Sequence, residues 1–317
     1  MKKHILLPLK ILVSIILITY LFTFIPFSEI LLSLKSSDYR LVLTGIVLTA
    51  FMVFLSALET QYLTNIQGIT LNVFEIIKIH LSTSFYALFL PGTLSGGAVK
   101  WFKFSQHGSK LSAAAVVIFN RFLEVFAIII IGMCFFLITI ETSDNPLLII
   151  AWLMMFLFMV IFYYILMSKH ALDYVGKNIL SLFLPTYISN KIGIFITTMQ
   201  QFQNLNRKEN FEIFGLLFLY HLIGVVAFFC FAKSLNIDVN IWVIGWVRSA
   251  IYILVMLPFY FAGFGIREGI LVFLLSKYGV LPNDSMALSF IFFFSQNLLF
   301  SLVGGLFDFK SFIEKKY

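Results

Sequence analysis

Charged side chains are scarce in this sequence: they make up 12% of its 317 residues, whereas soluble domains carry roughly 25%. Cysteine is rarer still, because only Cys134 and Cys230 are present, each inside an apolar run without a His or Cys neighbour. A disulfide framework and a zinc site are therefore excluded. Hydrophobic residues reach 61% and the mean hydropathy is +0.99, so the chain is expected to be embedded in a membrane.

Signatures of catalysis and nucleotide binding are also absent. No GxSxG, HExxH or Walker A string occurs, and the Gly263-x-Gly265 pair lacks the third glycine of a dinucleotide-binding loop. No hydrophilic module is large enough to hold a nucleotide or a tRNA. We therefore expect no catalytic residue, no cofactor, no metal and no nucleic-acid partner, and we interpret the net charge of +7 as a signal of membrane orientation.

Six apolar runs are long enough to cross a bilayer, which takes about 20 residues in a helix. They are residues 6–25, 41–62, 112–140, 147–167, 211–233 and 285–307. The first run follows Lys2 and Lys3 as a signal peptide would. It is too long for a signal peptide and no small-x-small cleavage site follows it, so we interpret it as a retained helix.

Two further apolar stretches, residues 73–90 and 242–257, each end in Leu-Pro followed by glycines, which interrupts a helix. The most basic segments are the two termini and the connection after residue 168, which places them in the cytoplasm. Counting crossings from these anchors makes each stretch one limb of a re-entrant hairpin, the first turning at residues 91–97. The prediction is an all-α, multi-pass protein of the cell (inner or plasma) membrane with both termini cytoplasmic.

An internal repeat supports this layout. Pro91, Gly96 and Lys100 recur 167 positions later as Pro258, Gly263 and Arg267. The single membrane domain, 1–317, then divides into a first repeat, 1–140, and an inverted second repeat, 147–310. This is a recurrent transporter design. Within the second repeat, residues 170–206 fit either a pair of interfacial helices split near Pro185 or a plain connecting loop.

The first hairpin carries a candidate anion site. Its returning limb starts near Gly96 and Gly97, where unpaired backbone N–H groups carry the positive end of the helix dipole. Lys100 follows about one turn later. Glycines admit close approach of a ligand, and N–H groups beside a cation suit a phosphate. The alternative is that the glycines serve packing and that Lys100 reaches out to the cytoplasmic surface.

The second hairpin repeats this pattern with Gly263, Gly265 and Arg267, and adds Glu268. Two cationic helix starts would then approach each other from opposite leaflets and form a cradle for a lipid phosphate. In the alternative reading, Arg267 simply pairs with an acid so that it can stay buried.

Three more charged residues lie within apolar runs, where each costs roughly 2.5 to 3.5 kcal/mol on insertion scales. Arg121 and Glu124 share one face of a helix because they are three positions apart. Arg121 could grip a phosphate while Glu124 orients it or carries a proton; alternatively the two only neutralise each other. Arg248 is a further binding candidate, or it packs against an acid such as Glu268.

The strings LPGTLSGGAVK, Asn120-Arg121-x-x-Glu124 and Gly263-x-Gly265-x-Arg267-Glu268 resemble the lysylphosphatidylglycerol synthase transmembrane family, a flippase-like, UPF-type family. The resemblance covers nearly the whole chain. Members fused to a cytoplasmic aminoacyl transferase make lysyl-phosphatidylglycerol and move it to the outer leaflet. The likeness here is to the membrane half alone, so we expect no synthase activity and do not expect the chain to be an enzyme. Some stand-alone relatives accompany glycosyltransferases that act on lipid-linked sugars.

The sequence thus predicts flippase-like or scramblase-like movement of an anionic phospholipid, such as aminoacylated phosphatidylglycerol, or of a polyprenyl-phosphate-linked lipid. The alternative is a non-transporting membrane partner of a lipid-modifying enzyme or glycosyltransferase of the cell envelope. A membrane lipid is the expected ligand, and a homo-oligomer stays open. The predicted substrate-binding residues are Gly96, Gly97, Lys100, Arg121, Glu124, Arg248, Gly263, Gly265, Arg267 and Glu268.

Overall fold

The computed structural model describes residues 27–89, 94–139, 146–174, 186–255 and 265–314, and within these ranges every regular element is a helix. Five helical stretches are long and apolar enough to cross a membrane. They are Tyr39–Ile66, Lys110–Ile138, Ile149–Met167, Arg207–Ser234 and Pro282–Phe309. These match five of the six predicted runs. The sixth, residues 6–25, lies outside the described residues. The chain is a multi-pass helical membrane protein, as predicted.

The helices follow one another without strands in the described ranges. In the first half they are α2 (Phe27–Lys35), α3 (Tyr39–Ile66), α4 (Val73–Phe89), α5 (Leu94–Phe104) and α6 (Lys110–Ile138). The middle contains α7 (Pro146–Met167), α8 (Lys169–Tyr174), α10 (Thr186–Met199) and a 3₁₀ turn, η3 (Gln200–Asn204). The second half contains α11 (Arg207–Ser234), α12 (Ile241–Val255), α13 (Ile266–Ser276), α14 (Pro282–Phe293), a π-helical turn η4 (Phe294–Leu298) and α15 (Leu299–Glu314).

Side-chain caps fix where the long helices begin. Asp38 accepts a hydrogen bond from the Arg40 N–H before α3, and Ser109 accepts one from the Ser112 N–H before α6. Asn206 and Glu209 form a reciprocal capping box at the start of α11. Each cap satisfies N–H groups that have no partner inside the helix, which stabilises the helix end typically by about 1 kcal/mol.

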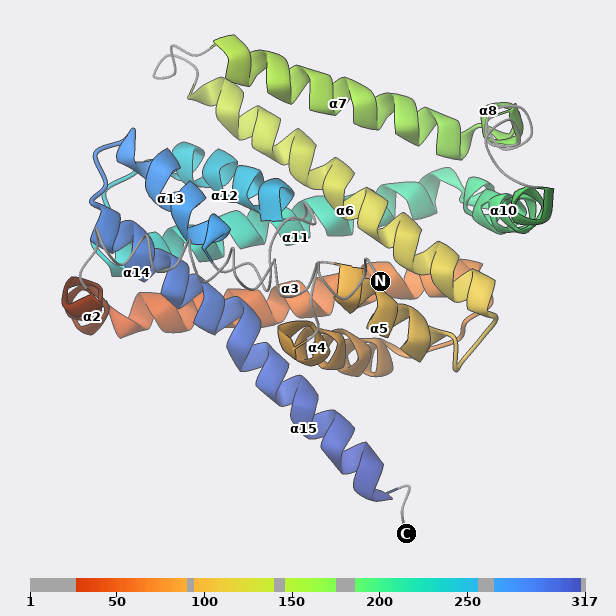
Figure 1. Cartoon of the computed structure of the whole chain (residues 1–317), viewed down its shortest axis with the longest axis horizontal. Coiled ribbons are helices and arrows are strands. Elements are labelled where there is room, and N and C mark those ends of the chain that lie inside the picture. The colour runs from red at the N-terminus through yellow and green to blue at the C-terminus, as the bar shows by residue number, and fades with distance from the viewer. Residues whose placement is uncertain (1–26, 90–93, 140–145, 175–185, 256–264, 315–317) are drawn as a thin grey trace, which may run out of the picture.

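The helices pack in a pattern that is symmetric between the two halves of the chain. The most extensive contact joins α3 to α11, and the next two join α4 to α15 and α6 to α12. Figure 1 shows α3, α6, α7 and α11 running lengthwise, with α4 crossing them nearly end-on and α15 leading away to the C-terminus. Thus α4 of the first half packs on α15 of the second half, and α12 of the second half packs on α6 of the first half.

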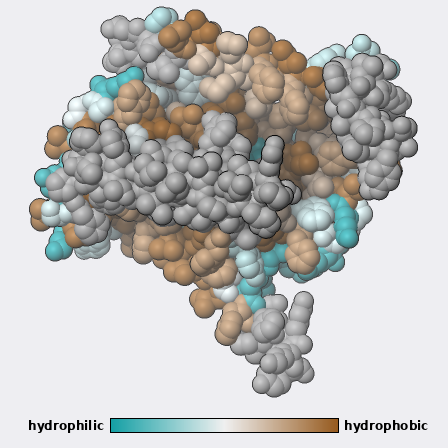
Figure 2. Space-filling view, in the orientation of Figure 1, coloured by the Kyte–Doolittle hydropathy of each residue, from teal (hydrophilic) through white to brown (hydrophobic). Residues whose placement is uncertain are grey.

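Apolar surface covers most of the described face in Figure 2, and hydrophilic residues gather mainly towards its left and right edges. α7 is the extreme case, because Met154 is 67% exposed and Phe158 is 62% exposed on a helix that is almost entirely apolar. Such surface is costly in water and suits contact with lipid chains. The polar residues that matter for function lie inside the bundle instead.

Several details differ from the sequence prediction. Helix α2 was not predicted, whereas α5 begins at Leu94, within one residue of the predicted start near residues 95–97. The last crossing is divided by the π-helical turn η4, which widens the helix next to the interior of the bundle. In residues 170–206 the described parts include the helices α8 and α10, while residues 175–185, which contain Pro185 and most of the first predicted helix, lie outside the described residues.

Gly304 is required where α15 crosses α4. A Cβ added there would lie 2.0 Å from the Leu81 carbonyl oxygen, a backbone atom that cannot move aside cheaply. We predict that Gly304→Ala lowers the melting temperature by several degrees, since overpacking typically costs about 1–3 kcal/mol. Thermal unfolding in detergent measures this. Gly269→Ala is the matched control, because no atom lies within 4 Å of its added Cβ; equal melting temperatures for the two variants would refute the close crossing.

Candidate functional site

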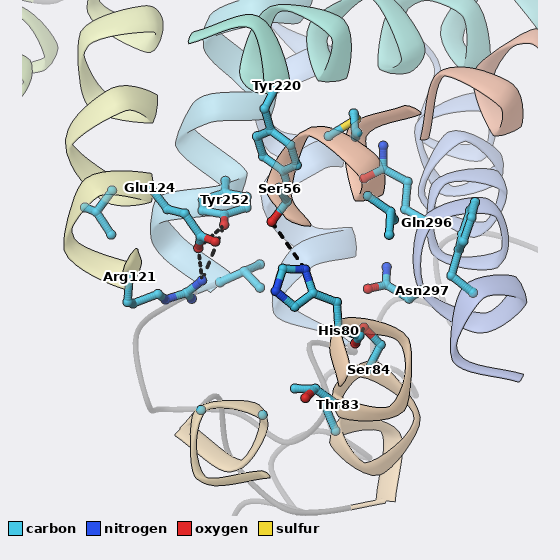
Figure 3. A pocket seen from close by; sticks show the side chains of 18 of the residues that line it. Ser56, His80, Thr83, Ser84, Arg121, Glu124, Tyr220, Tyr252, Gln296 and Asn297 are labelled. Carbon is cyan, nitrogen blue, oxygen red and sulfur yellow. Dashed lines mark hydrogen bonds and ion pairs between the residues drawn. The ribbon is translucent and has the colours of Figure 1, made fainter. Parts of the chain in front are cut away.

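A cavity of ≈ 820 Å³ lies inside the bundle and is lined from both halves of the chain. Figure 3 shows side chains from separate helices turned towards a common space, among them Arg121 from α6, His80 from α4, Tyr252 from α12 and Asn297 from η4. Seven of the ten predicted site residues line this cavity: Gly96, Gly97, Lys100, Arg121, Glu124, Arg248 and Arg267. The structure therefore brings together residues that are up to 171 positions apart in sequence.

Arg121 and Glu124 form an ion pair that a third residue completes. The Arg121 Nη1 lies 3.1 Å from the Glu124 Oε2, and the Tyr252 hydroxyl donates to the same oxygen at 3.2 Å. The Arg121 guanidinium also lies over the Tyr252 ring, 5.7 Å from its centroid. Its side chain stays 46% exposed, against 15% for Glu124. The pair is self-neutralising, and its guanidinium still has surface free to meet a ligand.

Arg267 and Glu268 form a second buried ion pair, at the start of α13. The Arg267 guanidinium donates to the Glu268 Oε1 through both Nε and Nη2, and the Ser289 hydroxyl donates to the same oxygen at 2.9 Å. The Arg267 Nε also donates to the Ser289 Oγ at 2.9 Å. This is the pairing with an acid that the alternative reading of Arg267 expected.

The backbone of Gly265 has a role other than the predicted one. Its φ of 89° is a left-handed conformation that favours glycine. Its N–H, expected to face a phosphate, instead donates to the Glu268 Oε2 at 2.7 Å as the cap of α13. This N–H is therefore already engaged within α13. Gly263 lies outside the described residues.

Lys100 belongs to a third polar group, which connects four helices, α3, α4, α5 and α6. Its Nζ donates to the Asn120 Oδ1 at 2.8 Å, and the Asn120 Nδ2 donates to the Glu59 Oε2 at 2.7 Å. Glu59 is only 1% exposed. The Thr60 hydroxyl lies 3.3 Å from the same Glu59 oxygen and 3.3 Å from the His80 Nε2. Lys100 is thus held at the cavity by Asn120 and does not extend away to the surface.

Arg248 is the exception among the buried cations. It is 4% exposed, and neither its Nε nor its Nη1 has a hydrogen-bond partner among the described residues. Its guanidinium packs on Gly224, where an added Cβ would lie 2.2 Å from the Arg248 Nη2. The expected pairing with an acid such as Glu268 is wrong, because that carboxylate is occupied by Arg267.

Gly96 and Gly97 lie in the first turn of α5, at the cavity wall. A Cβ at Gly96 would come no closer than 3.5 Å to Thr83, and one at Gly97 no closer than 3.6 Å to Val117. These are ordinary contacts, so helix packing does not require a glycine at either position. Backbone N–H groups in the first helical turn have no partner within the helix and are suited to an anion.

Sequence reasoning missed several of these residues. Glu59 lies inside a predicted crossing and could have been found by the same rule as the others, since an ionisable residue at bilayer depth indicates a functional site. Tyr252 and Ser289 carry no comparable signal, because hydroxyl groups are common in membrane helices. His80 lies in an apolar stretch and could have been found by the same rule as Glu59. In the described part of the chain, no three side chains of His, Cys, Asp or Glu converge on a point that could hold a metal ion.

The charge of the cavity favours an anion. Its lining contains four cationic side chains, Lys100, Arg121, Arg248 and Arg267, and one carboxylate, Glu124. Two further carboxylates lie next to the cavity without lining it. Glu59 accepts a hydrogen bond from Asn120, and Glu268 forms an ion pair with Arg267. Guanidinium and ammonium groups beside the start of a helix make a site for a phosphate or carboxylate.

Fold and site together define a multi-pass helical membrane protein with a cationic cavity buried between its two halves. The chain belongs to the lysylphosphatidylglycerol synthase TM region family, whose model matches residues 8–304, nearly the whole sequence. The matched region is the membrane region of that family. A comparison with curated proteins found no match.

We predict that Asn120→Ala destabilises the protein, because it leaves the Lys100 ammonium and the Glu59 carboxyl without their shared partner. Leaving a buried polar group unsatisfied costs about 1–3 kcal/mol. Melting temperatures in detergent test this, with the exposed Asn204→Ala as control. The double variant Glu59→Met/Asn120→Ala should recover part of the loss, since it removes the buried carboxyl as well. No difference between Asn120→Ala and the control would contradict the network.

Proposed function

We propose that this protein translocates an anionic lipid between membrane leaflets, in the manner of a flippase or scramblase. The observation that carries the proposal is the convergence of four cationic side chains, from helices in both halves of the chain, on one cavity inside a membrane bundle. Charges at bilayer depth are costly and are retained where they serve a ligand or a pathway. A phosphate headgroup is the ligand that these donors fit.

A second pocket supports a lipid over a free anion. This pocket of ≈ 440 Å³ lies between α2, α3 and the α14–η4 segment, and eight of its nine lining residues are apolar. The exception is Ser295. Phe293 belongs to the lining of both the polar cavity and this apolar pocket, and the Arg267 guanidinium lies 5.1 Å from its ring centroid. We propose that the headgroup occupies the cationic cavity and a hydrocarbon chain the apolar pocket across Phe293.

We also propose that α4–α5 and α12–α13 are re-entrant hairpins related by an inverted repeat. The described parts of α4 and α12 have 17 and 15 residues, about 25 and 22 Å of helix. Leu-Pro follows each of them in the sequence and would interrupt the helix before it crossed the roughly 30 Å hydrocarbon core. The symmetric packing of the two halves supports the repeat. A pair of similar hydrogen bonds supports it too. Lys100 of α5 donates to Asn120 of α6, and Arg267 of α13 donates to Ser289 of α14, so in each half the second limb of the hairpin is bonded to the helix that follows it.

In this proposal the cationic groups divide into two roles. Lys100 and Arg248, which form no ion pair in the described part of the chain, bind the phosphate directly together with the first turn of α5. Arg121 and Arg267 keep their carboxylates and add positive field at the two sides of the cavity. The sequence has no ATP-binding motif, so movement is passive or driven by an ion gradient. We propose no enzymatic activity.

The test is leaflet exchange of fluorescent lipids in liposomes that contain the purified protein, measured by dithionite quenching. We expect exchange of anionic lipids with the wild type and its loss in Arg267→Ala. Lys277→Ala is the matched control, since it removes an exposed cation at the end of the same helix, α13. Full exchange with Arg267→Ala would remove Arg267 from the pathway. Because this change strands the buried Glu268, Arg267→Ala/Glu268→Ala serves as a second variant.

Absence of exchange with every anionic lipid would favour the second candidate, a non-transporting partner of a cell-envelope enzyme. The exposed apolar side chains of the α10–α11 region, such as Ile194 at 55% and Phe211 at 79%, favour that segment as its docking surface. Replacing both residues with serine should then release the enzyme in co-purification, while leaving the cavity intact.

A further inference from the structure

Two of the cationic side chains that line the cavity form ion pairs with carboxylates, and the other two form none among the described residues. This difference indicates which kind of ligand the cavity would bind. Arg121 is matched by Glu124, and Arg267 by Glu268. Lys100 contacts the neutral amide of Asn120, and Arg248 leaves Nε and Nη1 unsatisfied although it is more than nine-tenths buried. An unpaired buried guanidinium is costly, because nothing replaces the water it has lost. Such a guanidinium favours the binding of an anionic ligand in the cavity that it lines.

The net charge of the side chains in and beside the cavity is positive whether or not Glu59 and Glu268 are ionised. Four cations face three carboxylates even when Glu59 and Glu268, which lie behind the wall, are both counted as ionised. Glu124, the carboxylate in the lining, already accepts from Arg121 and from the Tyr252 hydroxyl. Both of these bonds go to its Oε2, and Glu124 is the one carboxylate among the described lining residues, so an ammonium group from a ligand would have to share it with Arg121.

An aminoacylated headgroup fits this cavity poorly. Lysyl-phosphatidylglycerol carries two ammonium groups and one phosphodiester, so it would add cations to a cavity that already has an excess of them. At low dielectric such like-charge contacts are unfavourable. A phosphomonoester has up to two negative charges and three terminal oxygens, enough to meet both unpaired cations and the N–H groups in the first turn of α5.

We propose that the ligand of this cavity is a lipid with a terminal phosphomonoester or diphosphate, and that amine-bearing headgroups are selected against. The inference rests on the proposed function and specifies its substrate class. Arg248 is its central residue, because its buried guanidinium lines the cavity and an anionic group would supply both a counter-charge and hydrogen-bond acceptors.

Native mass spectrometry of the detergent-solubilised full chain tests the substrate class. The probes are farnesyl phosphate, dioctanoyl phosphatidate, dioctanoyl phosphatidylglycerol, its lysyl ester and inorganic phosphate. We expect the first two to bind at least about tenfold tighter than the rest, as one additional charged contact gives. Equal or tighter binding of the lysyl ester would overturn the proposal. Equal binding of inorganic phosphate would show that the site takes a free anion.

Arg248→Met separates a binding role from a structural one. If the Arg248 guanidinium serves to bind a ligand, replacing it with an apolar side chain should leave the melting temperature of the protein without added lipid unchanged or raise it. Farnesyl phosphate affinity should fall about tenfold. Lys35→Met, the same change at an exposed position of α2, should alter neither quantity. A marked fall in melting temperature with unchanged affinity would make Arg248 structural and overturn the proposal. Arg248→Lys, which keeps the charge, should retain part of the affinity.

Failure of this inference is distinguishable from failure of the proposed function. Tight binding of phosphomonoester lipids without leaflet exchange would refute translocation and keep the ligand class. Exchange of the lysyl ester at the rate of phosphatidate would refute the ligand class and keep translocation.

Discussion

The cost of burying charge in a membrane bundle governs this structure. An ion taken out of water needs a counter-charge and hydrogen bonds to remain buried. Arg121 and Arg267 obtain both from a carboxylate three and one positions further along their own helices, and each carboxylate also binds a hydroxyl from another helix. Lys100 relies on an amide instead. Arg248 has no such partner in the described chain, and it lines the cavity in which we propose that a ligand binds.

The same bonds that satisfy these charges also hold the helices in place. Glu268 caps α13 through the Gly265 N–H and fixes Ser289 of α14 at the same time. Asn120 joins α5 to α6 and, through Glu59, to α3. Changes to the site are therefore changes to the fold, and a useful variant must keep each carboxylate supplied with a donor.

Membership of the lysylphosphatidylglycerol synthase TM region family establishes what kind of membrane region this is. It leaves the lipid open, since the family is named for a synthase whose substrate chemistry need not extend to every membrane region. The cavity offers a local criterion: its cations outnumber its carboxylates, and its acids are already paired. Charge balance inside the bundle thus argues for a more anionic headgroup than the family name suggests.

The sequence alone determined the class of protein, the long helices and the charged residues worth following. This was possible because hydrocarbon thickness sets helix length and burial makes charge rare. Only the tertiary structure decided which charges meet. The arrival of Ser289 at the Arg267–Glu268 pair, the isolation of Arg248 and the contact of Glu59 with Asn120 depend on how distant helices cross. That geometry leaves no periodic or local signal in the sequence.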